Sequence, residues 1–403
     1  MRVVDVNELY SPTGGGVRTY VDRKMTIMAD MGHDLTVIAP GREDRVEERP
    51  GGGRIIYVRA RSMPFDPNYG LFWDAEPVWT LLDRLDPDVI ECCSPWRPAW
   101  FVSDWQGRAI RSYFMHGDNM ESYAKRWFQH VASPDRIERA FAWYDRYLER
   151  FLSRFDTVVS NGPALTNRLR ARGVRVDVDV SLGIERQPFS PALRDERLRA
   201  ELLRQCALPP DALLLLGVGR HHPEKRWPMV IDAVHRAGAR VPVGLVLLGH
   251  GMATRALQKH VGESPHIRLF FAIGDRRRLA TIMASADAYI HGSEREPFGL
   301  VVSEAPASGA PLIVPDTGGA AEVARPAFAE TYRGCDPVSC ADAILRFARR
   351  DRRIVRRAAC AAAAHVRSDE THVAELIAHY QGVIDRRDKL AELSLGNADG
   401  ARL

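Results

Sequence analysis

Short apolar stretches rich in β-branched residues alternate with longer stretches of helical periodicity along the whole chain. Continuous apolar runs of this length are typical of parallel strands, which are covered on both faces. The first series of predicted strands covers residues 3–6, 35–39, 55–58, 89–92, 111–115 and 157–160. A second series covers residues 213–218, 244–248, 267–271, 288–291 and 312–314. The pattern predicts an α/β protein in which a second sheet begins near residue 213.

A proline-rich and charged segment separates the two series. It spans residues 187–210 and contains Pro188, Pro191, Pro209 and Pro210. Because proline restricts its own backbone and that of the preceding residue, this segment is expected to be a linker. We therefore expect one domain over 1–187, a second over 188–370, and a C-terminal helix over 371–403 that is a candidate to cross back to the first domain.

The composition is that of a folded protein with two cores. The chain has 403 residues, of which 45% are hydrophobic and 27% charged, and its net charge is +4. That mild positive excess suits anionic ligands. No leader sequence is evident at the N-terminus, and no apolar run approaches the roughly 20 residues that span a bilayer. We expect a cytoplasmic protein whose six cysteines are reduced and mostly buried.

Three glycines, Gly14, Gly15 and Gly16, follow the first predicted strand. Glycine lets the backbone approach a ligand closely, and the N-terminus of the next helix favours an anion. The segment is neither G-x-G-x-x-G nor G-x-x-x-x-G-K-[ST], so it gives little support to dinucleotide or P-loop binding. A flexible turn is the alternative.

Two further loops carry candidate chemistry at equivalent places in the second half. Arg220 and Lys225 follow the strand at 213–218, where a guanidinium and an ammonium can clamp a diphosphate. Glu296 follows the strand at 288–291, and Glu304 lies about two turns into the next helix. Glu304 stands among apolar residues, and a buried carboxylate needs a partner, which a ligand can supply.

The order of these motifs resembles family four of the retaining glycosyltransferases, which have the GT-B fold. The resemblance includes the N-terminal glycine loop, Gly219-Arg220-x-x-x-Glu224-Lys225, Ala286-Asp287-Ala288, Glu296-x7-Glu304, and a Gly-Gly-x-x-Glu turn ending at Glu322. It covers nearly the whole chain. It implies two Rossmann-like domains with an active-site cleft between them, and transfer of a hexosyl group from a UDP- or GDP-sugar to a glycan, lipid-linked or small-molecule hydroxyl.

The resemblance also implies a role for each candidate residue. Arg220 and Lys225 would hold the diphosphate, which Gly15 and Gly16 approach from the other domain. Glu296 would contact the sugar, and Glu304 the ribose. The remaining donor contacts would come from Phe298, Gly299 and Leu300 through their amides, and from the segment around Ile273 for the base.

His116 matches the family histidine near the transferred sugar, and Asp118 is a neighbour that can face the acceptor. The favoured family mechanism is front-side, with the departing diphosphate taking the acceptor proton. It requires no cofactor beyond the sugar nucleotide, and we expect no metal. The segment Ser181-Leu182-Gly183 departs from the family's usual Asn-Gly, which affects the expected hinge geometry.

Several alternatives stay open at this point. A non-catalytic sugar-nucleotide binder would keep the clamp, whereas a Rossmann oxidoreductase or a pyridoxal-dependent phosphorylase lacks its motif here. Asp177-x-Asp179 alternates with valines as in a surface strand, which we favour over a metal site. Stretches 123–155 and 346–357 are rich in arginine; solvated helices are favoured over contact with a membrane. Nucleic acid is not an expected partner, and the sequence gives no oligomeric state.

Overall fold

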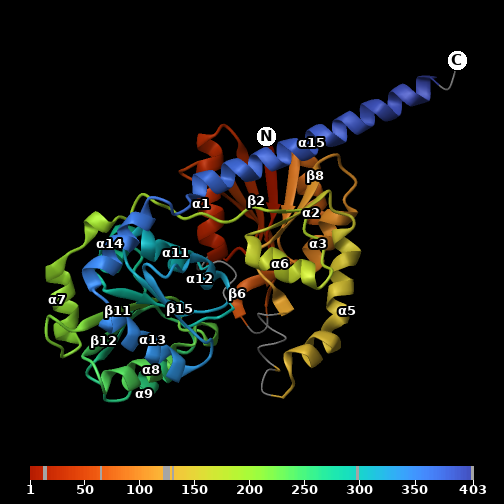
Figure 1. Ribbon diagram of the computed structural model, residues 1–403. Coiled ribbons are helices and arrows are strands. Elements are labelled where there is room, and N and C mark those ends of the chain that lie inside the picture. The colour runs from red at the N-terminus through yellow and green to blue at the C-terminus, as the bar shows by residue number, and fades with distance from the viewer. Residues whose placement is uncertain (12–15, 64–65, 121–127, 129–130, 296–298, 401–403) are drawn as a thin grey trace. The chain divides into compact units, whose positions relative to one another are not determined.

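The computed structural model describes residues 1–11, 16–63, 66–120, 128, 131–295 and 299–400. The chain forms two compact units (Figure 1). The first consists of Met1–Ser181 together with Asp369–Leu403, and the second of Leu182–Ser368. The boundary between the units thus falls after Ser181, whereas the sequence predicted it at residue 187. The C-terminal helix α15 (Asp369–Gly400) belongs to the first unit.

Over the described residues, the first unit is built on an eight-stranded sheet of order β10-β9-β8-β7-β1-β2-β4-β3. All neighbours are parallel except β3 and β4. The strands are β1 (Arg2–Val6), β2 (Asp34–Gly41), β3 (Arg45–Glu48), β4 (Arg54–Arg59), β7 (Val89–Cys92), β8 (Ile110–Met115), β9 (Thr157–Ser160) and β10 (Val178–Asp179). A separate hairpin pairs β5 (Arg61–Met63) with β6 (Asp66–Leu71).

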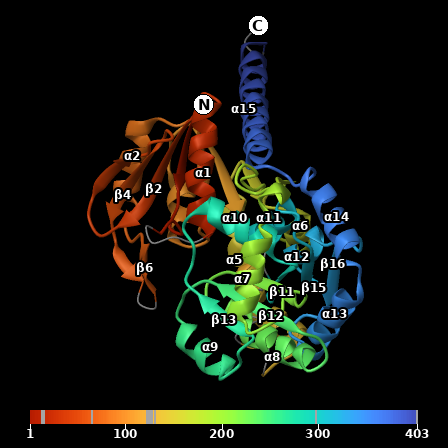
Figure 2. The same ribbon diagram turned by 90° about the vertical axis from the view of Figure 1, so that its left-hand side faces the viewer.

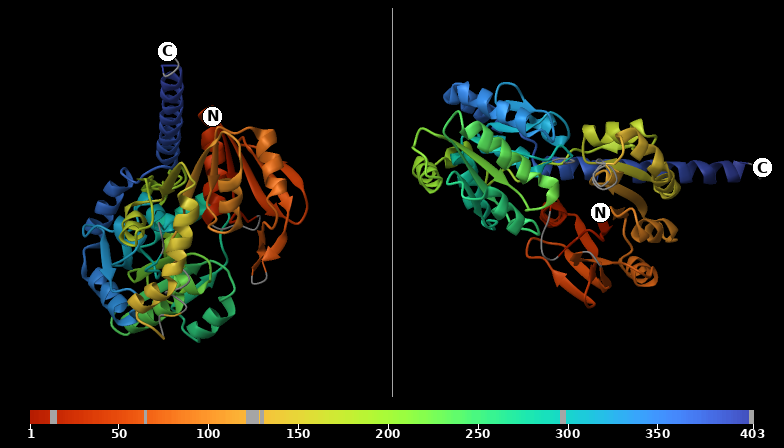
Figure 3. Two further views of the ribbon diagram at one scale, coloured as in Figure 1. Left: turned by 90° about the vertical axis from the view of Figure 1, so that its right-hand side faces the viewer. Right: turned by 90° about the horizontal axis from the view of Figure 1, so that it is seen from below.

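Helices cover both faces of this sheet. One face packs its apolar side chains against α2 (Glu76–Leu85), α3 (Arg97–Asp104), α5 (Pro134–Leu152) and α6 (Pro163–Ala171). The other face receives α1 (Gly16–Asp30) and α15, which contact each other. Figure 3 shows the sheet and its helices from two further sides.

A row of polar residues crosses the sheet beneath α1 and α15. Asp5, Glu91, Ser112 and Thr157 are register partners on β1, β7, β8 and β9. Three members of the row have partners on the two helices: Lys24 of α1 pairs with Glu91, Tyr380 of α15 bonds Glu91 and Ser112, and His379 of α15 contacts Thr157 at 2.8 Å. Asp5 accepts from the Asn7 side chain at 2.8 Å. Buried polar groups require such partners, so this row fixes where α15 attaches.

The second unit has, over its described residues, a six-stranded parallel sheet of order β13-β12-β11-β14-β15-β16. The strands are β11 (Leu213–Val218), β12 (Val243–Leu248), β13 (Ile267–Phe270), β14 (Ala288–Ile290), β15 (Leu312–Pro315) and β16 (Ala329–Tyr332). In chain order this is the 3-2-1-4-5-6 arrangement of a doubly wound nucleotide-binding fold.

Helices enclose this second sheet as well (Figure 2). One group contains α8 (Trp227–Gly238), α9 (Thr254–Val261) and α13 (Pro337–Arg349), which contact one another or β12 and β16. A second group contains α7 (Glu196–Gln205), α10 (Arg276–Ser285), α11 (Leu300–Ala307), α12 (Gly319–Val323) and α14 (Arg352–Ala363). The core of this unit is mainly aliphatic, with Trp227, Tyr289 and Tyr332 among its buried aromatic side chains.

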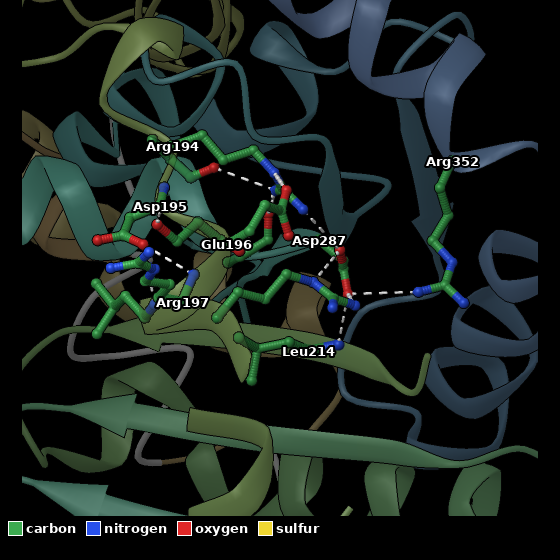
Figure 4. A network of polar contacts seen from close by, with 12 residues as sticks. Arg194, Asp195, Glu196, Arg197, Leu214, Asp287 and Arg352 are labelled. Carbon is green, nitrogen blue, oxygen red and sulfur yellow. Dashed lines mark hydrogen bonds and ion pairs between the residues drawn. The ribbon is translucent and has the colours of Figure 1, made fainter. Parts of the chain in front are cut away.

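Asp287, in the Ala-Asp-Ala motif before β14, joins several of these elements (Figure 4). Its carboxylate accepts two hydrogen bonds from Arg199 of α7, at 3.0 and 2.6 Å, and one from the Leu214 amide of β11 at 2.9 Å. Arg194 and Arg352 lie 3.5 and 3.6 Å away. The charges pair inside the fold, so Asp287 has a structural role.

Each predicted strand corresponds to an observed one, which confirms the α/β class. Strands β3, β5, β6 and β16 were not predicted. The segment 187–210, expected to be a linker, belongs to the second unit and contains η2 (Pro191–Leu193) and α7. Cys92, Cys93, Cys206 and Cys340 are buried, Cys360 is intermediate, and only Cys335 of the six is exposed; none forms a disulfide.

Candidate functional site

The topology of the second unit places its ligand site. Strand order reverses between β11 and β14, and ligands of doubly wound sheets bind beyond the carboxyl ends of the strands at that point. The loop after β11 carries Arg220 and Lys225, and the loop after β14 leads to the Glu296-x7-Glu304 motif. The fold therefore brings the two candidate loops to one edge of the sheet.

Arg220 is presented outward by a supported loop. Its side chain is 55% exposed, and its backbone carbonyl accepts a 3.2 Å hydrogen bond from the buried Trp227 indole. Glu224 lies 3.2 Å from the guanidinium. Burial by itself raises the pKa of Glu224, but the His222 hydrogen bond and the charges of Lys225 and Arg220 outweigh it and lower that pKa to about 2. Glu224 is thus an anion beside the two cations of the proposed clamp, and it bonds one of them, Arg220.

The two loops contact each other directly. A Cβ on Gly292 would lie 2.4 Å from the Lys225 carbonyl oxygen, so this position after β14 admits no side chain without a shift of the backbone. Arg226, which follows Lys225, makes two 2.6 Å hydrogen bonds to Glu294. Glu296 and Phe298, the next candidates along the chain, lie outside the described residues.

The start of α11 is described from Gly299 onward. Gly299 is buried with φ 71° and precedes Leu300, the partly buried first residue of the helix. Its left-handed conformation explains why glycine stands there. Glu304 lies in the second turn and is buried, as its apolar neighbours indicated. The protein itself supplies one partner: Arg276 Nη2 donates to Glu304 Oε1 at 2.8 Å.

The segment expected to lie against the base connects β13 with α10. Ile273 is partly buried there, while its neighbours Ala272 and Gly274 are exposed. Phe271 is 77% exposed and stacks on His250, which follows β12, with 5.7 Å between ring centroids. An aromatic face beside this loop is a candidate platform for a base. This platform was not predicted from the sequence, because Phe271 was expected to be the last residue of the strand, which ends instead at Phe270.

The first unit carries the remaining candidates. Gly15 lies outside the described residues. Gly16 is the exposed first residue of α1, with nothing within 4 Å of where a Cβ would stand. His116 follows β8 at the carboxyl edge of the first sheet, as expected. Its ring lies 5.3 Å from that of Tyr20 on α1 and 4.7 Å from that of Phe114, measured between centroids.

The environment of His116 disfavours its cationic form. Burial, helped by the charge of Lys24, lowers the pKa of His116 to about 3, so the imidazole is neutral at physiological pH. Asp118, two residues after His116, is buried. Its carboxylate accepts from Arg172 at 2.6 Å and from the Met120 amide at 2.9 Å. These bonds give Asp118 a structural role in this loop, and its contact with the acceptor stays a prediction.

The Asp177-x-Asp179 segment also serves the fold. Val178 and Asp179 form β10, the surface strand that the alternation predicted. Asp177 accepts from the Val158 amide at 2.9 Å and pairs with Arg175 at 2.7 Å. Over the described part of the chain, no three His, Cys, Asp or Glu side chains gather as metal ligands would.

Taken together, the fold and loops define a nucleotide-sugar-dependent transferase of the GT-B class. Comparison with known proteins gives the family. Residues 14–180 match "Glycosyltransferase Family 4" and residues 199–364 match "Glycosyl transferases group 1". The chain is 30% identical over 326 residues to a GDP-mannose-dependent alpha-(1-6)-phosphatidylinositol dimannoside mannosyltransferase of Mycobacterium tuberculosis, covering 80% of this chain and 81% of that protein. The chain belongs to the family-four glycosyltransferases.

Three other comparisons extend over nearly the full length. A GDP-mannose-dependent alpha-mannosyltransferase of Mycolicibacterium smegmatis is 28% identical over 400 residues, 96% of this chain and 99% of that one. Sucrose-phosphate synthase from Thermosynechococcus elongatus superposes with a TM-score of 0.73 at 18% identity, covering 96% of this chain and 100% of that one. Anabaena HepE in complex with UDP gives 0.69 at 16%, with coverages of 95% and 100%. The structural likenesses confirm the GT-B fold.

Among the described helices, none carries an apolar stretch of the length that crossing a bilayer requires.

Proposed function

We propose that the protein transfers mannose from GDP-mannose to a hydroxyl group of a lipid-linked acceptor, with retention of the anomeric configuration. The observation that carries the donor assignment is the near full-length likeness to a protein named as a GDP-mannose-dependent alpha-mannosyltransferase. The acceptor assignment is supported by the relative named for a phosphatidylinositol dimannoside.

In the proposed reaction, the protein stabilises the leaving diphosphate and orients the substrates. Arg220 and Lys225 would neutralise the charge that grows as the glycosidic bond breaks, with Glu224 holding Arg220 in place. The diphosphate itself would take the proton of the acceptor hydroxyl. Glu296 would orient the mannose, Glu304 the ribose, and the amides of Phe298, Gly299 and Leu300 the phosphate end. His116, neutral at the pH of the reaction, would contact the sugar without ionising.

We also propose that no metal takes part, because two cations already face the diphosphate. Mannosyl transfer measured in excess chelator and then with added Mg²⁺ tests this. Equal rates are expected, and a requirement for Mg²⁺ would contradict the proposal.

A lipid-linked acceptor suggests that the protein works in the cytoplasm at a membrane surface. Exposed apolar side chains on and beside α5 support this extension: Val131 is 79% and Trp143 52% exposed. Arg136, Arg139 and Arg146 are exposed on the same helix. Sedimentation with phosphatidylinositol vesicles tests this idea. More wild type than Trp143→Ala should sediment with the vesicles, and equal amounts of the two proteins left in the supernatant would contradict the idea.

The decisive experiment compares donors. Radiolabelled GDP-mannose, GDP-glucose, UDP-glucose and UDP-galactose are each incubated with the protein and a mycobacterial phosphatidylinositol mannoside extract. Transfer from GDP-mannose alone into the lipid fraction is expected. Transfer from a UDP-sugar would overturn the donor assignment, and binding of GDP-mannose with neither transfer nor hydrolysis would favour a non-catalytic sugar-nucleotide protein.

A further inference from the structure

Arg276 connects three residues of the second unit. It is the first residue of α10, directly after the loop of Phe271 and Ile273. Its Nη2 donates to Glu304 Oε1 at 2.8 Å, and its Nε donates to Glu185 Oε2 at 3.2 Å. Its guanidinium carbon lies 4.8 Å from the centre of the Phe189 ring. Two carboxylates and an aromatic face therefore fix the guanidinium.

Glu304 depends on this contact. The residue is only 4% exposed, and a carboxylate in that position is costly unless a cation and hydrogen bonds accompany it. Arg276 supplies the cation from a neighbouring helix and bonds one of the two carboxylate oxygens. The direction of that bond sets the plane of the carboxylate, and with it the direction in which the group accepts further hydrogen bonds.

We propose that Arg276 is the positioning residue for ribose recognition: it holds Glu304 oriented to accept hydrogen bonds from the ribose hydroxyls of the donor nucleotide. The inference rests on the proposed function, in which Glu304 contacts the ribose. It adds a residue outside the Glu296-x7-Glu304 motif, and its effect is limited to ligands that carry ribose hydroxyls.

Arginine suits this position better than lysine. The planar guanidinium bonds Glu304 and Glu185 through different nitrogens while its face lies against Phe189. A lysine ammonium keeps the charge but lacks the fixed fork and the planar face. Arg276→Lys is therefore expected to retain only part of the hydroxyl recognition, and Arg276→Gln almost none of it.

The experiment measures the Kd of GDP and of 2′,3′-dideoxy-GDP by calorimetry on wild type, Arg276→Gln, Arg276→Lys and Arg277→Gln. Hydrogen bonds from the ribose hydroxyls to a charged group should make wild type bind GDP about 10- to 100-fold more tightly than 2′,3′-dideoxy-GDP. The preference should fall to about threefold or less in Arg276→Gln and to an intermediate value in Arg276→Lys. Arg277→Gln is the matched control, because Arg277 is exposed and only its backbone amide bonds Asp275.

Because both ligands are compared on the same variant, a general loss of stability changes both constants and leaves their ratio unchanged. An unchanged ratio in Arg276→Gln would overturn the inference while the donor assignment stands. Wild-type protein that binds GDP and 2′,3′-dideoxy-GDP equally tightly would also overturn the inference. If wild type binds neither GDP nor UDP, the proposed function itself fails. Where Arg276→Gln does not fold, the ratio in Arg276→Lys decides.

Discussion

Arg226 donates two hydrogen bonds to Glu294, from Nε to Oε2 and from Nη2 to Oε1, each 2.6 Å long. Arg226 follows Lys225 directly, and Glu294 stands two residues before Glu296. The pair therefore ties the loop of the proposed diphosphate clamp to the loop that leads to the proposed sugar contact. Both side chains are mostly withdrawn from solvent, with 21% and 11% exposure. Arg226 also has a φ of 49°, a conformation that favours glycine.

This geometry predicts different effects of two substitutions at Arg226. Arg226→Ala removes two hydrogen bonds from the mostly buried carboxylate of Glu294, which keeps its 3.3 Å ion pair with Arg295, and should lower the free energy of unfolding by about 2 kcal/mol. Arg226→Gly loses the same pair but relieves the left-handed backbone, so it should be about 1 kcal/mol more stable than the alanine variant. Urea denaturation of both variants measures the difference. A glycine variant less stable than the alanine variant would contradict the assigned strain. Turnover should fall in both.

The same pair predicts a pH dependence. Burial raises the pKa of Glu294, but the hydrogen bonds and charge of Arg226 outweigh it, and the net shift is downward. A depressed carboxyl pKa gives stability that is present above the unfolded pKa of about 4.5 and is lost as the pH falls below it. Wild type should therefore lose more stability than Glu294→Gln between pH 5 and pH 3. Parallel curves for the two proteins would show that the pair contributes nothing.

Arg220→Ala should impair turnover and leave the fold intact. The side chain is more than half exposed, so its removal should change the free energy of unfolding by no more than about 0.5 kcal/mol. Its proposed contact strengthens as the diphosphate departs, and losing it should reduce both kcat and kcat/KM about 100-fold or more. Steady-state kinetics with GDP-mannose measure this. Arg236→Ala, an exposed arginine at the end of α8, is the matched control. Near-normal turnover in Arg220→Ala would refute the clamp.

His116 should act as a neutral group. With a pKa of about 3, it does not change its charge between pH 5 and pH 9. We expect His116→Ala to lower kcat through lost contacts while the shape of the pH–rate profile stays that of wild type. Profiles of kcat/KM for the two proteins test this. If a limb near pH 6 to 7 in wild type disappears in the variant, His116 titrates during the reaction and its assigned state is wrong.

The strands were predictable because parallel strands are continuously apolar, and the two cores follow from them. The segment 187–210 was misassigned because its prolines were taken to exclude a helix. They lie instead on either side of α7, whose N-cap is Asp195. Prolines at those positions end a helix without preventing one.

The motif residues were predictable from spacing, but the residues that hold them were not. Arg226–Glu294 spans 68 positions and depends on β11 and β14 being neighbours in the sheet. Arg276–Glu304 depends on α10 and α11 packing together. The bond from Arg172 to Asp118 joins residues 54 positions apart and likewise gives no local signal in the sequence.

Asp5 gives a prediction about stability in the first unit. Burial and the nearby charge of Glu91 raise the pKa of Asp5 to about 7, against the opposing effects of Lys24 and Asn7. In the unfolded chain, Asp5 titrates near 3.8. Between these values the folded protein holds a proton that the unfolded chain has released. The stability that this proton contributes is fully present below about pH 4 and is lost as the pH rises to about 7.

Asp5→Asn mimics the protonated carboxyl and should remove this dependence. One proton corresponds to a slope of about 1.4 kcal/mol per pH unit. Relative to the variant, wild type should therefore become steadily less stable from pH 5 to pH 7, with no further change above pH 8. The measurement is urea unfolding at pH 5, 6, 7 and 8. Asp34→Asn, whose side chain is 45% exposed, is the control and should follow wild type. If Asp5→Asn also follows wild type, Asp5 is ionised across this range, and Lys24 must compensate two carboxylates in the polar row beneath α15.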